Sequence, residues 1–81
     1  MKLTLDQFVT YQIKVPGEIR KKWLGWNDKI KVEHGIEKYP ITTITCVLDQ
    51  AGLHGFLRHL YAMGLPLIEV VCIDCPGVDN R

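Results

Sequence analysis

Two groups of side chains in this sequence are of types that could do chemistry. Cys72 and Cys75 are separated by two residues, and two thiolates at this spacing can chelate zinc or form a disulfide. His54, Arg58 and Tyr61 stand at i, i+4 and i+7, so on a helix they would line one flank and could bind a small anion. This trio is our candidate ligand-binding site, with an ordinary solvated helix surface as the alternative.

The cysteine pair gives a weak indication of a metal or redox site. A structural zinc site needs four ligands, and the third cysteine, Cys46, falls in a strand that we do not expect to neighbour the last one. A redox pair normally opens a helix, whose N-terminus lowers the thiol pKa, whereas this pair ends a strand. We therefore expect no metal site and no cofactor, with Cys72 a reduced core thiol and Cys75 incidental.

Motifs of the common enzyme classes are missing from the sequence. It contains no Gly-rich phosphate loop with its lysine, no G-x-S-x-G segment and no His-x-x-x-His with an intervening glutamate. Its carboxylates are scattered singly, so no pair stands out as a general acid and base. We assign no catalytic residue and expect a protein that is not an enzyme.

The elements that position these residues follow from the hydropathy pattern. Alternating or β-branched runs predict four strands, over residues 8–15, 29–34, 41–48 and 67–74. Ile19, Trp23 and Trp26 at i, i+4 and i+7 predict a short helix over 18–26. Between the third and fourth strands, Asp49 is suited to cap a helix over 50–63, which Gly64 would end.

This order of elements predicts an α+β fold. Two right-handed strand-helix-strand crossovers joined by a hairpin give the ferredoxin-like βαββαβ arrangement, a four-stranded antiparallel sheet of order 4-1-3-2 with both helices on one face. We expect one domain over 1–81, with an ordered core over about 8–75 and a frayed tail over 76–81. The alternative is a three-stranded sheet in which the first helix is reduced to a turn.

The predicted core comes from the inward positions of these elements. The strands should contribute Val9, Tyr11, Ile13, Val15, Ile30, Val32, Ile44, Cys46, Leu48, Ile68, Val70 and Cys72, and the helices Ile19, Trp23, Trp26, Leu53, Phe56, Leu57 and Leu60. On the open face of the sheet, the outward positions are apolar at Val47, Leu67, Val71 and Ile73. Because a contiguous apolar patch on a small soluble domain usually marks an interface, we take these four as candidate interface residues. The alternative is that the C-terminal tail covers them.

Composition narrows the function classes further. The 81 residues are 47% hydrophobic and 23% charged, which is typical of a globular protein, and the net charge of +1 argues against a nucleic-acid-binding protein. We find no apolar run of membrane-spanning or signal-peptide length, and three cysteines are too few for a secreted disulfide framework. We therefore expect a cytoplasmic protein with no membrane association.

One pattern resembles a known family. The segments D-Q-A-G-L-H-G-F-L over 49–57, G-L-P-L-I over 64–68 and K-W-L-G-W over 22–26 resemble small uncharacterised bacterial and archaeal proteins. Their typical form is D-Q-A-A-L-H-G-L-L followed by G-L-P-L-L-S-V. The resemblance implies the same fold and a prokaryotic cytoplasmic setting but no activity. This chain departs from the pattern at Gly52, where alanine is usual, and in its cysteines after the last strand.

These observations lead to two hypotheses about function. The first is a small homo-oligomeric or protein-interaction module that uses the open sheet face, acting as a homodimer or binding a protein partner. The alternative is a small-ligand sensor or enzyme that binds an anion through His54, Arg58 and Tyr61.

Overall fold

The computed structural model describes residues 4–25 and 30–74 of the chain. Its elements are β1 (Val9–Pro16), α1 (Lys21–Leu24), β2 (Lys31–Ile36), β3 (Pro40–Leu48), α2 (Gln50–Ala62) and β4 (Glu69–Cys72). All six elements therefore occur in the predicted order, and the fold is α+β. No helix within the described ranges is long and apolar enough to cross a membrane.

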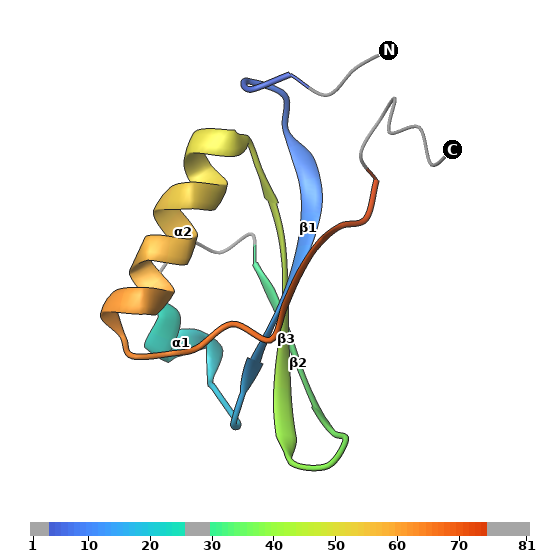
Figure 1. Cartoon of the computed structure of the whole chain (residues 1–81), viewed down its shortest axis with the longest axis vertical. Helices are drawn as coiled ribbons and strands as arrows, with labels where there is room; N and C mark the ends of the chain where they lie inside the picture. Colours follow the sequence, from blue (N-terminus) through green and yellow to red (C-terminus); the bar gives the residue numbers. More distant parts are fainter. Residues whose placement is uncertain (1–3, 26–29, 75–81) are drawn as a thin grey trace.

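The four strands form one open antiparallel sheet of order β2-β3-β1-β4, which reads 4-1-3-2 from the opposite edge. β1 lies in the middle, where Ile13 is opposite Ile44 of β3 on one side and Val70 of β4 on the other. Its residues alternate between buried and half-buried, as expected for a strand with one face on the core. Figure 1 shows α2 lying across one face of this sheet and leaving the other face open.

The core lies between α2 and the sheet. Its buried members come from five segments of the chain: Val9, Tyr11, Ile13, Val15, Leu24, Ile30, Ile44, Cys46, Leu48, Leu53, Phe56 and Leu60. Most of the predicted core is therefore confirmed, and Ile19, Val32 and Leu57 pack against it while partly buried. The prediction was wrong at Ile68 and Val70, which are 43% and 39% exposed, because β4 is an edge strand that α2 does not cover.

Helix α2 begins where the sequence predicts. The Asp49 side chain accepts a hydrogen bond from the backbone N–H of Gly52 at 2.7 Å, which satisfies one of the free donors of the first turn. The helix ends at Ala62, and Gly64 follows with a φ of +79°, a left-handed conformation that glycine adopts without steric cost. These terminal residues fix how far α2 extends across the sheet.

Helix α1 is a single turn, which corrects the predicted helix over 18–26. Gly25 ends it in the left-handed region at a φ of +60°. One turn presents one side chain to the core, and that residue is Leu24. Trp23, predicted to be buried, is 53% exposed, with the Arg20 guanidinium 5.9 Å from its ring centre. Trp26, Cys75 and the predicted tail over 76–81 lie outside the described residues.

Candidate functional site

The predicted ligand-binding trio lies on the outer side of α2. His54, Arg58 and Tyr61 are all exposed, and Tyr61 is 84% exposed. Within the described residues, none of the three makes a hydrogen bond or an ion pair, so their polar groups are free to meet a ligand. No second element contributes a side chain that joins the three, and the structure therefore gives a shared helix flank rather than an enclosed site.

The cysteines differ in their states. Cys46 is buried, and burial raises the pKa of its thiol from 9.0 to about 11, so it stays protonated and unreactive near neutral pH. Cys72 is half-buried at the end of β4 and disulfide-bonded, which corrects our expectation of a reduced core thiol there. Within 4–25 and 30–74, no three residues of metal-binding type lie close enough to hold an ion.

The four predicted interface residues do not form one continuous patch on the open face. Val71 and Ile73 lie on β4 or just after it, whereas Val47 lies on β3, on the far side of β1. The β1 residue between Val47 and Ile73 is Thr10, whose backbone carbonyl accepts a hydrogen bond from the Ile73 N–H at 2.8 Å. Leu67 precedes β4 and is also exposed. The apolar surface is therefore concentrated at β4.

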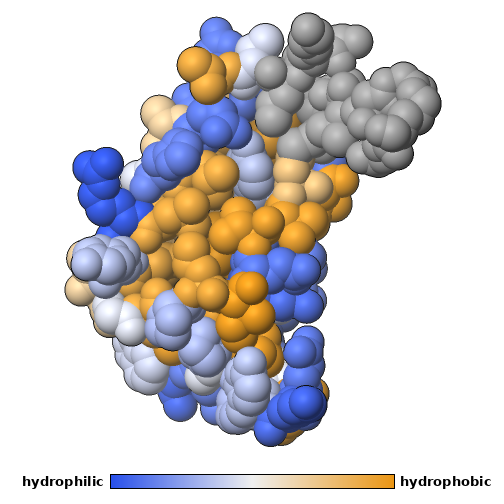
Figure 2. Space-filling model, in the orientation of Figure 1, coloured by the Kyte–Doolittle hydropathy of each residue, from blue (hydrophilic) through white to orange (hydrophobic). Residues whose placement is uncertain are grey.

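Exposed apolar side chains occur on both faces of the β4 edge. Val71 and Ile73 are 39% and 51% exposed on the open face, and Ile68 and Val70 are exposed on the side facing α2. Figure 2 shows the hydrophobic surface running across the centre of the view, beside α2 and over β4. Sequence reasoning missed the second half of this surface because it assumed that α2 would cover every inward position.

Among the strands of the described residues, none pairs with the outer side of β4. Ile73 donates to Thr10, and residues of an antiparallel strand point their backbone groups alternately to either side. The N–H and C=O of Val70 therefore point away from β1, toward the free edge. A strand that offers free backbone groups flanked by apolar side chains is a template for pairing with another strand.

The opposite edge of the sheet, β2, has a different character. Lys31 and Glu33 project from it with mostly exposed side chains, and their charged atoms lie 3.8 Å apart. Charged side chains of this kind discourage a second strand from pairing, because the new contact would desolvate them. The two edges of the sheet therefore differ, because β2 has two charged side chains on this face and β4 has a single one, Glu69, followed by Val70, Val71 and Cys72.

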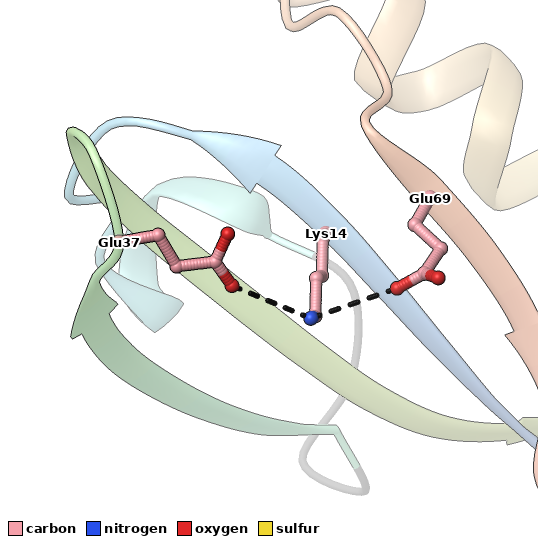
Figure 3. Close-up of polar contacts among 3 residues, drawn as sticks. All are labelled: Lys14, Glu37 and Glu69. Carbon is pink, nitrogen blue, oxygen red and sulfur yellow. Dashed lines mark ion pairs between the residues drawn. The ribbon is translucent and has the colours of Figure 1, made fainter.

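A group of three charged side chains ties β4 to the rest of the sheet (Figure 3). The Lys14 Nζ on β1 lies 3.6 Å from Glu69 Oε1 on β4 and 3.6 Å from Glu37 Oε2 in the β2–β3 turn. Beyond β4, the Asp74 carboxylate accepts hydrogen bonds from the Thr10 N–H at 2.6 Å and from its hydroxyl at 3.1 Å. These contacts hold both ends of β4 against β1.

A second structured region surrounds the loop that follows β1. The buried Thr42 hydroxyl donates to the Gly17 carbonyl at 2.7 Å and accepts from the Ile19 N–H at 2.8 Å. Gly17 itself has a φ of +92°, a conformation that a side chain would strain, and its N–H donates to Pro40. Three hydrogen bonds thereby hold this loop against β3.

His34 of β2 adds a further contact to the same loop. Its Nε2 lies 2.7 Å from the Ile19 carbonyl, and because a carbonyl only accepts, Nε2 carries a proton; in this tautomer Nδ1 is an acceptor. Sequence reasoning missed this region. One signal was available, because Thr42 is the only polar residue at the inward positions 42, 44, 46 and 48 of β3.

Comparison with known protein families gives a match over most of the chain. The model of a family described as "Domain of unknown function (DUF8691)" matches residues 10–71, which is more than half of the chain. The matched range runs from the start of β1 into β4 and so covers both regions described above. No similar chain was found among curated proteins or among solved structures.

Proposed function

The chain belongs to the DUF8691 family, a domain of unknown function, and from its surfaces we propose that it is a homodimeric module in which the β4 edges of two copies pair. The observation that carries this proposal is the combination of free backbone groups at Val70 with exposed apolar side chains on both faces of the same strand. We further propose that the fold is ferredoxin-like.

A second copy fits this edge better than an unrelated partner does. A two-fold axis perpendicular to the sheet would place β4 antiparallel to β4 and continue one sheet across both copies. The net charge of +1 gives little repulsion between copies, and Lys14, which also pairs with Glu37, offsets part of the charge of Glu69. Antiparallel pairing also keeps the two Glu69 side chains apart, whereas parallel pairing would place them side by side.

The available area sets the expected strength. The apolar side chains at this edge are only 39% to 51% exposed, so two copies together offer less apolar surface than the roughly 1,000 Å² that a specific interface buries as a minimum. We therefore expect a weak dimer, with a dissociation constant of roughly 10 μM. Such a dimer would form and separate within the concentration range of ordinary solution measurements.

Light scattering during size exclusion tests the proposal. Over roughly 5 to 500 μM protein, the mass should rise from that of the 9.3 kDa monomer toward twice that value. Val71→Lys places a charge at the proposed edge and should keep the protein monomeric throughout. Val47→Lys is the matched control, because Val47 is 51% exposed on the same face but lies on β3 and not at the edge.

The two variants also separate edge pairing from stacking of open faces. If both substitutions abolish the dimer, the copies stack face to face and our edge assignment is wrong. If the wild-type protein stays monomeric at the highest concentration, the homodimer proposal itself is wrong. Circular dichroism spectra of both variants, compared with that of the wild-type protein, test whether each variant keeps the fold.

A second candidate function rests on His54, Arg58 and Tyr61. The observation that favours it is that all three polar groups are exposed on one helix flank and unengaged within the described structure. Titration with inorganic phosphate, followed by the amide and imidazole NMR signals of α2, tests this candidate. Saturable shifts that disappear in His54→Ala would support it, and unsaturable or unchanged shifts would exclude it.

A further inference from the structure

A hollow of about 460 Å³ opens between the loop that follows β1 and the β2–β3 hairpin. This volume falls within the range of small-molecule sites in proteins, roughly 300 to 1,000 Å³. Its lining residues are Glu18, His34, Gly35, Ile36, Pro40 and Ile41. It lies away from the β4 edge, so the inference below does not depend on the proposed dimer.

The hollow combines an apolar floor with two polar groups. Ile36, Pro40 and Ile41 supply hydrocarbon surface, and the polar side chains are Glu18 and His34. Among the described residues no lysine or arginine lines it, and the one carboxylate in this lining is that of Glu18. An anion would find no counter-charge among these residues, whereas a cation would.

Both polar groups are available to a ligand. Glu18 makes no hydrogen bond or ion pair with any other described residue, and His34 uses Nε2 for the Ile19 carbonyl. In the tautomer with the proton on Nε2, Nδ1 can accept a hydrogen bond. A group with a positive charge and several N–H donors satisfies both the carboxylate and the ring nitrogen, and a primary ammonium has these properties.

The loop that carries Glu18 is held in place before any ligand arrives. Its neighbours on either side, Gly17 and Ile19, are both bonded to the buried Thr42 hydroxyl, and Ile19 also accepts from His34. A carboxylate on a fixed loop loses less conformational entropy on binding than one on a free loop does.

We propose that this hollow binds a small primary amine with an apolar body, with Glu18 pairing with the ammonium group and His34 Nδ1 accepting one of its hydrogens. The hydrocarbon or aromatic part of the ligand lies against Ile36, Pro40 and Ile41. Because the site is open and its carboxylate is exposed, a fragment-sized amine should bind with a dissociation constant on the order of 1 mM.

NMR titration of the isotope-labelled full chain with benzylamine tests the proposal. The signals of Glu18, His34 and Gly35 should shift and saturate. Benzyl alcohol has the same aromatic body without the charge, and it should bind more weakly. Glu18→Gln should weaken benzylamine binding about three- to tenfold and leave benzyl alcohol unchanged, since only the ammonium uses the carboxylate.

The matched control is Glu33→Gln. Glu33 directly precedes His34 on β2 but projects from the opposite face, where it lies near Lys31, so its substitution should not alter benzylamine binding. The proposal is overturned if benzylamine causes no saturable shift up to about 20 mM. It is equally overturned if benzyl alcohol binds as well as benzylamine, or if Glu33→Gln weakens binding as much as Glu18→Gln does.

Discussion

The Thr42 hydroxyl joins the loop after β1 to the sheet, and Thr42→Val tests how much this connection stabilises the fold. Valine has nearly the same shape, so the substitution removes the hydroxyl without opening a cavity. The Gly17 carbonyl and the Ile19 N–H then lose their partner. Because both loop residues are only half-buried, water can hydrate them in part.

The expected magnitude follows from these two hydrogen bonds. Each contributes roughly 0.5 to 1.5 kcal/mol net, and partial hydration together with the added methyl group lowers the combined loss. We expect Thr42→Val to reduce the free energy of unfolding by about 1 to 2 kcal/mol. For a domain of this size that corresponds to a fall in Tm on the order of 5 to 15 °C.

Urea denaturation measures the loss, and two further variants isolate its cause. Thr43→Val changes the next residue of β3, which makes no side-chain hydrogen bond within the described structure, and should shift the unfolding free energy by less than about 0.5 kcal/mol. Thr42→Ser keeps the hydroxyl, so the Ile19 amide should stay protected from hydrogen exchange in this variant. In Thr42→Val the same amide should lose its protection. Equal stability and equal Ile19 protection in Thr42→Val and wild type would refute this account.

Four other substitutions or measurements have expected outcomes. Asp49→Ala removes the cap of α2 and should lower the unfolding free energy by about 0.5 to 2 kcal/mol in urea denaturation. Gly52→Ala should bring less than the usual gain of about 1 kcal/mol in the same assay, because the new methyl would lie 3.0 Å from Asp49 Oδ1. Lys14→Met should cost less than about 1 kcal/mol, since both of its ion pairs are partly exposed, and a larger loss would contradict this view. The Cys46 thiol ionises at a lower pH in the unfolded chain than in the folded one, because burial raises its pKa from 9.0 to about 11. The free energy of unfolding should therefore fall as the pH rises through this range, and the Cys46→Ala variant should lack the part of the fall that this thiol causes.

The sequence was sufficient to predict the elements and most of the core, because periodicity reports which face of an element is buried. α2 was predicted most accurately, since Asp49 and Gly64 mark its ends through local backbone chemistry. Prediction failed at Trp23 because three aromatic or aliphatic residues at helical spacing do not reveal that a helix lasts only one turn. Leu24, at no special spacing, occupies the buried position instead.

The candidate sites were harder to predict because they depend on contacts between distant segments. Val70 has the pattern of an inward residue, and only the position of β4 at the sheet edge leaves it exposed. Glu18 and His34 are far apart in the chain, and the pairing of β2 with β3 brings them to one hollow. The apolar character of the last strand was visible in the sequence, whereas the exposure of both its faces was not.

Because β1 is central in the sheet, its pairing depends on strands that are synthesised after it. β1 is the first strand to be synthesised, yet its partners are β3 and β4, and Tyr11 is paired with Cys72. Pairings between such distant segments form slowly, because a long loop must close before they gain any stabilising contact. A nascent chain that has not yet produced residues 69–72 therefore keeps one side of β1 without a partner. In this protein the strand that completes the sheet is also the strand through which we propose that two copies pair, so the proposed pairing requires β4 to have first reached its place beside β1.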